Sequence, residues 1–446
     1  MGFQQGVSGL NASAKQLDVI GNNVANVNTV GFKGSRAEFA DIYASTFASS
    51  SNTAGIGARV TTIAQQFGQG NTTTTNNPLD LAITGNGFFR MQDRTGSISY
   101  ARNGQFQMDK EGYIVNNGQY LTGWGVDQAT GTFLQGSTPQ PIQLQFANIG
   151  AKATGGTGVS GAGLNLGINL NATDKVLTAP YSSSDPTSYN YSTSATVFDS
   201  LGVAHTQTFY FVKDAPPATS PPTQTWSVYY SLDGKDVNTN GTVSPTAGTL
   251  LKGTLTYDAN GQYQSYTSNI VPPATSASGG NDDWFSVVSG PTGINNGSNG
   301  LDFQLYFDKS TQFGSPYNLN TLTQDGYTDG ILTGLSVSKE GVVQGRYSNG
   351  QTRDVAKVVL ATFPNNQGLQ PLGDNRWAES FASGQPLVNS PGQGSTGFLQ
   401  AAAVEDSNVD LTSELVNLIT AQRNYQANAQ TVKAQDTILQ TIVNLR

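Results

Sequence analysis

Several stretches of the chain carry residue types that could perform chemistry. His205 is the single histidine among 446 residues, and its Thr-rich segment has neither a nucleophile elbow nor an oxyanion turn. Asp282 and Asp283 form a carboxylate pair, but adjacent residues on a strand point to opposite faces, so they cannot flank one bond without a bulge. We interpret the pair as a turn and His205 as structural, and we predict that the protein is not an enzyme.

Two other stretches have incomplete ligand-binding patterns. Residues 156–161 match the dinucleotide fingerprint, but no strand precedes them and no helix follows to face a pyrophosphate. Residues 236–241 match the first half of a calcium loop, but Ala247 stands where a bidentate Glu is needed. We interpret the first stretch as a flexible linker and the second as a polar hairpin tip. The sequence therefore predicts no cofactor and no metal ion.

Composition narrows the function further. Charged residues make up 12% of the chain and the formal net charge is −8, so no basic surface is available to neutralise phosphates. The absence of cysteine excludes disulfides and thiolate sites. No run of about 18 apolar residues could cross a bilayer, and no apolar segment typical of a cleaved signal peptide follows Lys15, the first basic residue. We expect neither a nucleic-acid partner nor membrane insertion.

The two ends of the chain have the most regular pattern. Apolar residues recur in alternating steps of four and three, which is typical of a helix that buries one face. We expect an N-terminal helix over residues 1–27 and a C-terminal helix over residues 407–446, the second capped by Asp410. The residues predicted to mediate polymerisation through these stripes are Phe3, Val7, Leu10, Leu17, Val24, Leu411, Leu415, Leu418, Tyr425, Val432 and Leu439.

Periodicity alone leaves two packing arrangements open. The helices can form a hairpin that only closes the molecule, or they can pack against copies of themselves in neighbouring molecules. The stripes contain the polar residues Gln422 and Asp436 and the small residues Ala14 and Gly21, which disfavour a dry seam of only two helices. We therefore favour packing between molecules, with the polar residues setting the register.

An Asn- and Gly-rich stretch follows the N-terminal stripe. Asn and Gly tolerate left-handed backbone and bond to their own main chain, so residues of these types in this density end a helix. The stretch is either a plain loop or a fixed joint between the helix and the rest of the chain. The residues of the predicted joint are Asn22, Asn23, Asn26, Thr29, Gly31, Phe32 and Lys33.

Between the helices the sequence predicts nested β domains. Residues 79–83 alternate like a half-buried strand, and the pairs Asn103-Gly104 and Asn117-Gly118 favour hairpins. We predict a multidomain, mainly β fold with terminal α-helices that form a coiled-coil stem, the second β domain being inserted in the first. The expected segments are residues 28–76 (connector), 77–146 (first β domain, before the insertion), 147–320 (inserted outer β domain), 321–390 (first β domain, after the insertion) and 391–406 (connector).

Both ends of the sequence resemble the bacterial flagellar rod–hook family of axial proteins. The resemblance lies in residues 9–43, which include Gly-Asn-Asn-Val-Ala-Asn-Val-Asn-Thr-Val-Gly-Phe-Lys, and in residues 406–440. Residues 83–89 and 100–115 resemble the family's first β domain. Rod members are shorter and lack a large insertion, whereas residues 170–174 and 192–202 resemble the second domain of the hook members, and residues 215–320 match no family pattern.

The resemblance implies a structural subunit of the flagellar hook, polymerised into a curved hollow tube that acts as a flexible universal joint and transmits torque from rod to filament. The implied partners are copies of the chain itself, the flagellar rod, hook cap and hook–filament junction proteins, and the flagellar type III export apparatus. The implied location is the extracellular flagellum, reached without a cleaved signal peptide.

Three other functions compete with this one. A distal-rod protein of the same family is disfavoured by the inserted domain. A secreted β-rich adhesin or fibre subunit would bind host glycans rather than itself. A secreted glycosidase is disfavoured by the missing carboxylate geometry.

Overall fold

The computed structural model describes residues 2–42, 55, 57–127, 131–144, 148–155, 162–216, 223–243, 249–269 and 284–444. The chain divides into two compact units. Unit 1 comprises Met1–Phe146, Thr333–Arg346 and Thr352–Arg446, and unit 2 comprises Ala147–Leu332 and Tyr347–Gln351. The predicted mainly β fold with terminal helices is confirmed.

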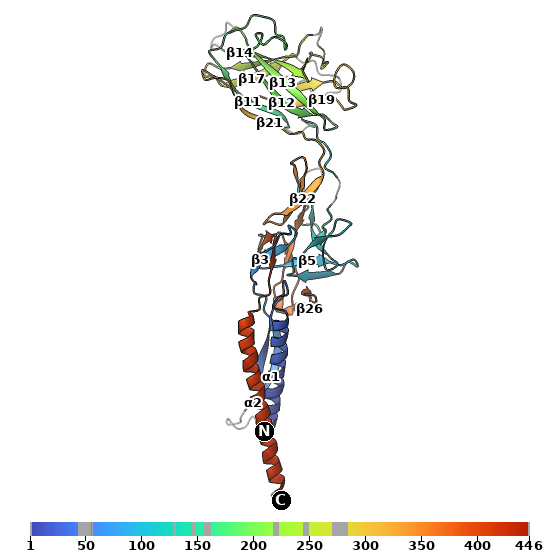
Figure 1. Cartoon of the computed structure of the whole chain (residues 1–446), viewed down its shortest axis with the longest axis vertical. Coiled ribbons are helices and arrows are strands. Elements are labelled where there is room, and N and C mark those ends of the chain that lie inside the picture. Colours follow the sequence, from blue (N-terminus) through green and yellow to red (C-terminus); the bar gives the residue numbers. More distant parts are fainter. Residues whose placement is uncertain are drawn as a thin grey trace. The chain divides into compact units, whose positions relative to one another are not determined.

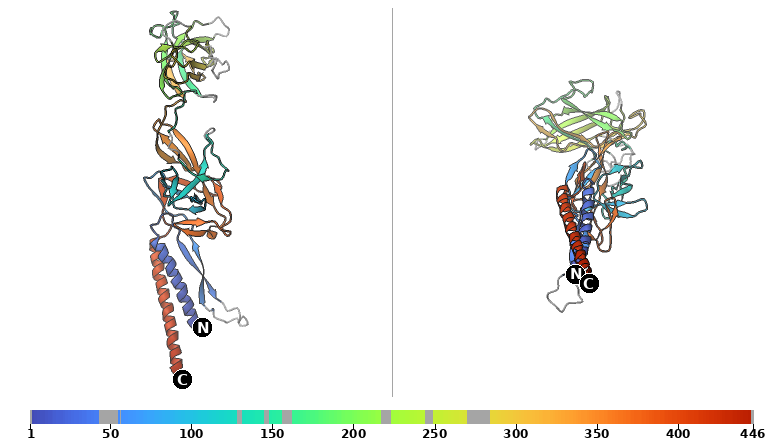
Figure 2. Two further views of the ribbon diagram at one scale, coloured as in Figure 1. Left: turned by 90° about the vertical axis from the view of Figure 1, so that its right-hand side faces the viewer. Right: turned by 60° about the horizontal axis from the view of Figure 1, so that its bottom comes forward.

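Unit 1 contains two long helices from opposite ends of the chain. Helices α1 (Gly2–Ala25) and α2 (Leu411–Asn444) lie side by side and antiparallel (Figures 1 and 2). Asp410 caps α2 as predicted, because its Oδ1 accepts hydrogen bonds from the backbone N–H groups of Thr412 and Ser413 at 2.9 and 3.4 Å. At 1.5 Å per residue, the 34 residues of α2 extend over about 51 Å.

The segment expected to be a connector, residues 28–76, contains strands. Strands β1 (Ser35–Ile42) and β2 (Gly57–Gln65) form an antiparallel ribbon that lies along α1 (Figure 2). The short strand β3 (Thr72–Thr74) follows. The polar composition concealed these strands, although the consecutive β-branched residues Val60, Thr61, Thr62 and Ile63 of β2 favour a strand. Two aromatic residues of the same segment, Tyr43 and Phe47, lie outside the described residues.

The main sheet of unit 1 combines strands from both halves of the chain. It runs β22-β23-β24-β9-β5-β6-β27-β26, with β7, β8, β10, β25 and β28 paired at its sides. Their bounds are β5 (Phe88–Gln92), β6 (Ile98–Ala101), β7 (Gln107–Met108), β8 (Ile114–Asn116), β9 (Gln119–Gly125), β10 (Gln140–Pro141), β22 (Leu332–Val337), β23 (Val342–Tyr347), β24 (Thr352–Val358), β25 (Leu360–Thr362), β26 (Gln370–Gly373), β27 (Arg376–Ala378) and β28 (Leu387–Asn389). A short 3₁₀ helix, η2 (Asn366–Gly368), precedes β26. The buried side chains of Phe89, Leu121 and Val358 therefore share one core although they are far apart in sequence.

The second expected connector, residues 391–406, is also folded within unit 1. Strand β29 (Phe398–Ala401) pairs with β4 (Leu81–Thr84), and β30 (Ala403–Glu405) pairs with β3. All three residues of β30 are buried. The expected connector therefore contains strands that complete ladders with the beginning of the β region.

Unit 2 is built from two β-sheets. One runs β12-β13-β14-β16-β17 with β15 beside β14, and the other runs β18-β19-β11-β20 with β21 beside β11. Their bounds are β11 (Gly163–Asn171), β12 (Tyr191–Phe198), β13 (Ala204–Lys213), β14 (Gln224–Leu232), β15 (Lys235–Asp236), β16 (Lys252–Tyr257), β17 (Tyr263–Ser268), β18 (Trp284–Val287), β19 (Leu301–Tyr306), β20 (Thr311–Phe313) and β21 (Asn318–Gln324). Both sheets contribute to one core, with Phe209 and Trp226 from the first and Leu164 and Phe303 from the second.

The expected boundary between residues 320 and 321 falls inside β21. This strand pairs antiparallel with β11 from Asn318 opposite Asn169 to Gln324 opposite Leu164. A boundary within a paired strand would break its ladder, so unit 2 continues to Leu332.

Candidate functional site

The two helices contact each other through small and polar residues. A Cβ added to Gly6 would come within 2.9 Å of the Val432 side chain, and one added to Gly9 would meet Asn428. Near the other end of the pair, Asn23 donates a hydrogen bond to Glu414 Oε1 at 3.1 Å. At Gly6 and Gly9 the seam therefore depends on the close approach that glycine permits, and Val432 is the predicted stripe residue of α2 that Gly6 meets.

The seam also fixes how far each helix extends. Gly6 lies opposite Val432 and Asn23 lies opposite Glu414, so the start of α1 lies near residue 436 of α2. The last two turns of α2, including Ile438 and Leu439, therefore extend past α1 (Figure 2). Both of these side chains are exposed.

Most of the predicted polymerisation residues lie on open surface in the single chain. Phe3, Val7, Leu411, Leu415, Tyr425 and Leu439 are exposed, and Leu10, Leu17, Val24, Leu418 and Val432 are half-buried. Among the side chains of α2 that the structure describes, the exposed residues Val416, Ile419 and Ile438 were not among those predicted. Val416 and Ile419 stand three residues apart, and this second apolar row beside the first was the signal that could have revealed them.

A cleft opens where the helices meet the β1–β2 ribbon. It has a volume of about 420 Å³, and Val19, Ile20 and Val409 form apolar parts of its wall. Asn23 and Glu414, which hydrogen-bond across the seam, also line it. The seam is therefore open to a further side chain at this end.

The predicted joint begins with hydrogen bonds within its own turn. Asn26 donates to the carbonyl of Asn22 at 3.0 Å, and Thr29 donates to Asn26 Oδ1 at 3.2 Å. Gly31 has φ +70°, and a Cβ there would lie 2.5 Å from the backbone nitrogen of Asn103. Glycine is required at residue 31 both by its backbone conformation and by this close approach.

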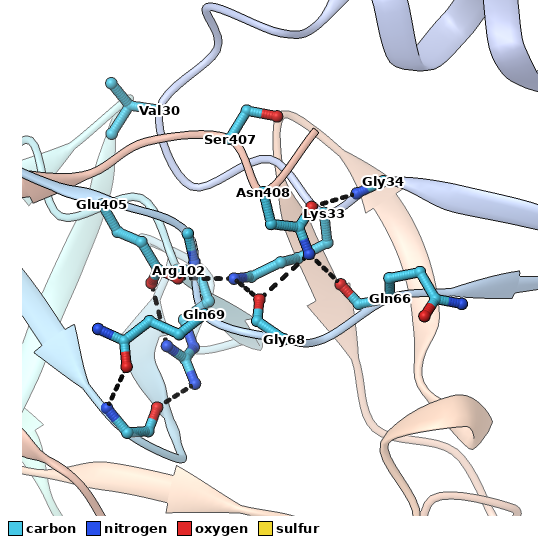
Figure 3. Close-up of polar contacts among 12 residues, drawn as sticks. Val30, Lys33, Gly34, Gln66, Gly68, Gln69, Arg102, Glu405, Ser407 and Asn408 are labelled. Atoms are coloured by element: carbon cyan, nitrogen blue, oxygen red, sulfur yellow. Dashed lines mark hydrogen bonds and ion pairs between the residues drawn. The ribbon is translucent and has the colours of Figure 1, made fainter. Parts of the chain in front are cut away.

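Lys33 is the charged centre of the joint, and it is fully buried (Figure 3). Its Nζ contacts Glu405 Oε1 at 2.7 Å and donates to the carbonyl of Gly68, also at 2.7 Å. Glu405 Oε2 accepts from Arg102 Nη1 at 3.0 Å, and the Glu405 carbonyl accepts from the Gly31 N–H at 2.7 Å. We refer to Lys33, Arg102 and Glu405 as the buried charge cluster, which joins three distant segments of unit 1.

Burial lowers the pKa of both cations of the buried charge cluster. Desolvation lowers the pKa of Lys33, and the nearby Glu405 carboxylate opposes that shift. Desolvation also lowers the pKa of Arg102, again opposed by Glu405. One carboxylate therefore compensates two cations in the interior, and Glu405 contributes a charge that neither cation can lose without cost.

Two asparagines fasten the segments around this cluster. Asn408 donates to the carbonyls of Gln66 and Gly68 at 2.6 and 3.1 Å, and its Oδ1 accepts from the Gly34 N–H at 2.8 Å (Figure 3). Asn23 Oδ1 accepts from the Ser35 N–H at 2.9 Å. Each amide uses donor and acceptor together, so the ends of α1 and α2 are tied to the same loops. Phe32, the remaining joint residue, is half-buried.

Lys33 was predicted as a joint residue, but its partners were not. Glu405 lies 372 residues from Lys33. Asn408 lies three residues after Glu405 and Arg102 comes from a further segment, and none of the three stands in a local pattern that marks a buried charge. Only the three-dimensional pairing identifies them.

Of the stretches that were weighed as catalytic or ligand-binding sites, the described residues His205 and Asp236 make hydrogen bonds within unit 2. His205 lies between Asp233 at 2.7 Å and Asp199 at 3.4 Å. Asp236 accepts hydrogen bonds from Tyr181 and Ser183, which fasten a loop to unit 2. Residues 156–161, Ala247, Asp282 and Asp283 lie outside the described residues.

The described ranges also bear on metal binding and on membrane insertion. They hold no group of three or more His, Cys, Asp and Glu side chains placed to bind a metal ion. Within them, no helix is both long and apolar enough to cross a bilayer.

Four family models match successive stretches of the chain. They are "Flagella basal body rod protein" over residues 3–33, "Flagellar hook protein FlgE/F/G D1 domain" over residues 82–152, "Flagellar basal body protein FlaE D2 domain" over residues 169–327, and "Flagellar basal body rod FlgEFG protein C-terminal" over residues 400–445. The first and last of these cover the helices and the joint, and the D2 model falls within unit 2.

Whole-length relatives agree with the family models. The chain is 42% identical to "Flagellar hook protein FlgE" of Salmonella typhimurium and 41% identical to that of Escherichia coli, covering 100% of both chains in each case. The crystal structure of Helicobacter pylori flagellar hook protein FlgE2 aligns with a TM-score of 0.50 and 14% identity over 74% of this chain and 99% of that one, a likeness of fold. With relatives of this identity over its entire length, the chain belongs to the flagellar hook protein family.

Proposed function

We propose that this chain, a structural subunit of the flagellar hook by its family, polymerises through its terminal helices into a hollow, curved tube. The tube acts as a flexible universal joint that transmits torque from rod to filament. The proposal assigns no catalytic role and no cofactor. Its partners are copies of the same chain, together with the rod, hook cap and hook–filament junction proteins.

The observation that carries the proposal is the unsatisfied apolar surface of α2. Val416 and Ile419 are 59% and 51% exposed, and Leu415 beside them is also exposed. The seam with α1 lies at Gly6, Gly9 and Asn23 and leaves these three side chains of α2 exposed. Large exposed apolar patches mark interaction sites, and helices of neighbouring copies match the shape and length of this one.

The joint supports the mechanical side of the proposal. A subunit that transmits torque needs its helices fixed to its β-sheets, and the buried charge cluster fixes them from three segments. The wet, polar surfaces of the β-sheets can exchange contacts at little net cost, because a lost hydrogen bond to a neighbour is replaced by one to water. Firm helices inside and adaptable sheets outside combine torsional stiffness with bending.

Location and export follow from the same proposal. The subunit lies in the extracellular region of the flagellum and reaches it through the flagellar type III export apparatus, without a cleaved signal peptide. Low charge and the absence of cysteine suit a chain that passes unfolded through a narrow channel.

The test is assembly of the purified chain and of one charged variant. Leu415→Asp places a carboxylate in the apolar surface, where burial against a neighbouring helix would desolvate it. We expect electron microscopy to show tubes for the wild-type chain and none for the variant, with the same circular dichroism for both monomers. Gln426→Asp is the matched control, because it adds the same charge to an exposed polar position of α2. Tubes of normal yield from Leu415→Asp would contradict the role of the helices.

A further inference from the structure

One aromatic side chain of unit 1 is fully exposed at the surface. Phe381 is 105% exposed, whereas the next most exposed large hydrophobic side chain in the described ranges of the chain, Ile331, is 61% exposed. Isolated exposed apolar residues are common on proteins, so exposure alone does not indicate a binding site. What distinguishes Phe381 is the loop that holds it and a pocket nearby.

The loop around Phe381 is fixed by hydrogen bonds on both sides of the ring. Ser380 Oγ accepts from the Ala382 and Ser383 N–H groups at 3.1 and 3.2 Å and donates to the Gly368 carbonyl at 2.5 Å. Asn365 donates to the Ala382 carbonyl at 3.0 Å. The loop is tied to the turn at residues 365–368, so it cannot fold the ring back onto its own unit without breaking these bonds.

A pocket of about 340 Å³ opens on the other side of this turn. Its lining includes the buried residues Phe88 and Phe363, whose ring centroids are 6.1 Å apart, and the apolar residues Pro364 and Leu387. The uncharged polar residues Asn86, Thr362, Asn366 and Ser395 complete the lining with Gly87. No charged side chain lines it among the described residues. A dry apolar cavity of about 150 Å³ holds a benzene molecule, so this pocket has room for a phenyl ring.

We propose that Phe381 of one subunit inserts into the pocket formed by Phe88, Phe363, Pro364 and Leu387 of a neighbouring copy. The inserted ring meets two aromatic rings, which favour edge-to-face contact, and it displaces water from an uncharged pocket. Each copy then offers one ring and one pocket. One such contact leaves a ring on one copy and a pocket on the other free, so it propagates along a polymer when further copies occupy them, whereas reciprocal insertion would close a two-fold pair.

A second copy is the occupant that the structure favours. Ring and pocket match in chemistry, and both are held by the same turn, so every copy carries both halves at a fixed separation. An ionic ligand has no counter-charge in this lining. The inference rests on the proposed polymerisation and adds a contact between β units to the contacts between helices.

Cysteine cross-linking tests the contact directly, because the chain has no cysteine of its own. Phe381→Cys and Leu387→Cys are prepared as separate full-length variants, assembled together and treated with a short bis-maleimide. We expect covalent dimers that contain one copy of each variant, and no dimers when either variant is assembled alone. Ile98→Cys, at an exposed position of β6, replaces Phe381→Cys in the matched control and is expected to give no dimer with Leu387→Cys.

An assembly measurement without the cross-linker supports the same test. Burial of a phenyl ring predicts that Phe381→Ala raises the critical concentration for polymerisation about tenfold to a hundredfold, while Ile98→Ala leaves it unchanged. Normal tubes from Phe381→Ala at the wild-type critical concentration would overturn the contact, as would tubes that give no mixed cross-link. Cross-linking of Phe381→Cys to itself would overturn it in favour of a two-fold pair. If the wild-type chain forms no polymer, the proposed function fails and this contact fails with it.

Discussion

Replacing Glu405 with Gln tests the buried charge cluster most sharply. The substitution keeps the shape of the side chain and removes the one anion that compensates Lys33 and Arg102. Glu405 is fully buried and contacts the two cations at 2.7 and 3.0 Å. A Gln amide can present its oxygen to only one of them, so its N–H group faces the other cation, donor against donor.

The expected loss of stability follows from burial. Removing one partner of a buried ion pair costs about 3–5 kcal/mol, because the remaining charge is left without compensation. Here two cations lose their partner, so we expect a loss of about 5 kcal/mol for Glu405→Gln. An exposed pair behaves differently: Lys15 and Asp18 are 3.3 Å apart with side chains 63% and 70% exposed. Asp18→Asn therefore serves as the matched control, with an expected loss of at most about 1 kcal/mol.

Hydrogen exchange measured under conditions of fast reclosing gives the opening free energy of each unit separately. The amides of β5, β6 and β9 report unit 1, and those of β13 and β14 in the same samples report unit 2, which we expect to be unchanged. The difference in opening free energy of unit 1 between the wild-type chain and Glu405→Gln should shrink as pH rises towards the ordinary lysine pKa of about 10.4. Desolvation lowers the pKa of Lys33 in the folded chain and Glu405 opposes that shift, so removing Glu405 lowers the pKa of Lys33 further. The folded variant therefore releases the Lys33 proton at a lower pH than the folded wild-type chain, and its stability rises more with pH in the alkaline range.

Two results would refute this reasoning. One is a Glu405→Gln variant that retains the wild-type opening free energy of unit 1 within about 1 kcal/mol, the range of a surface pair. The other is a double variant, Lys33→Met with Glu405→Gln, that is no more stable than Glu405→Gln alone. In either case the cluster would not store the electrostatic energy assigned to it.

Two further predictions concern the backbone of the joint and the tyrosines of unit 2. Gly31→Ala should destabilise unit 1 by about 1–3 kcal/mol or more, because residue 31 has a positive φ and lies close to Asn103. Gly21→Ala should stabilise α1 by up to about 1 kcal/mol, because no atom lies within 4 Å of the added Cβ. Thermal unfolding measures both variants, and equal effects on stability would contradict the role of Gly31. Desolvation raises the pKa of Tyr191 to about 12, so the stability it contributes is complete below the unfolded tyrosine pKa of about 10 and is lost as pH rises between these values. Burial also raises the pKa of Tyr230, so tyrosinate absorbance should rise together with the loss of circular dichroism; full ionisation with native dichroism would refute this.

Short sequence signals predicted correctly those turns whose conformation depends only on adjacent residues. Asn117 and Gly118 have φ 47° and 74° and form the turn between β8 and β9, as the Asn-Gly signal indicates. The same signal failed at Asn103-Gly104, where β6 pairs with β5 and β27 and β7 pairs with β8, so no hairpin forms there. A strand from the far half of the chain supplied a better partner than the nearest one.

The candidate site was only partly predictable for the same reason. The apolar stripes of the helices are visible as periodic patterns, but Gly6 and Gly9 at the seam carry no apolar signal, and their role depends on what lies opposite them. Lys33 stands in a recognisable turn sequence, whereas Glu405 has significance only through two cations that the chain brings to it from residues 33 and 102.

Because Glu405 lies late in the chain, the two units differ in how much of the chain each needs in order to fold. Residues 163–324 contain every strand of the unit 2 sheets and can close without the last stretch of the polypeptide. Unit 1 holds two buried cations without a counter-charge until β30 is in place, so a copy that ends before Glu405 is expected to have a lower opening free energy in unit 1.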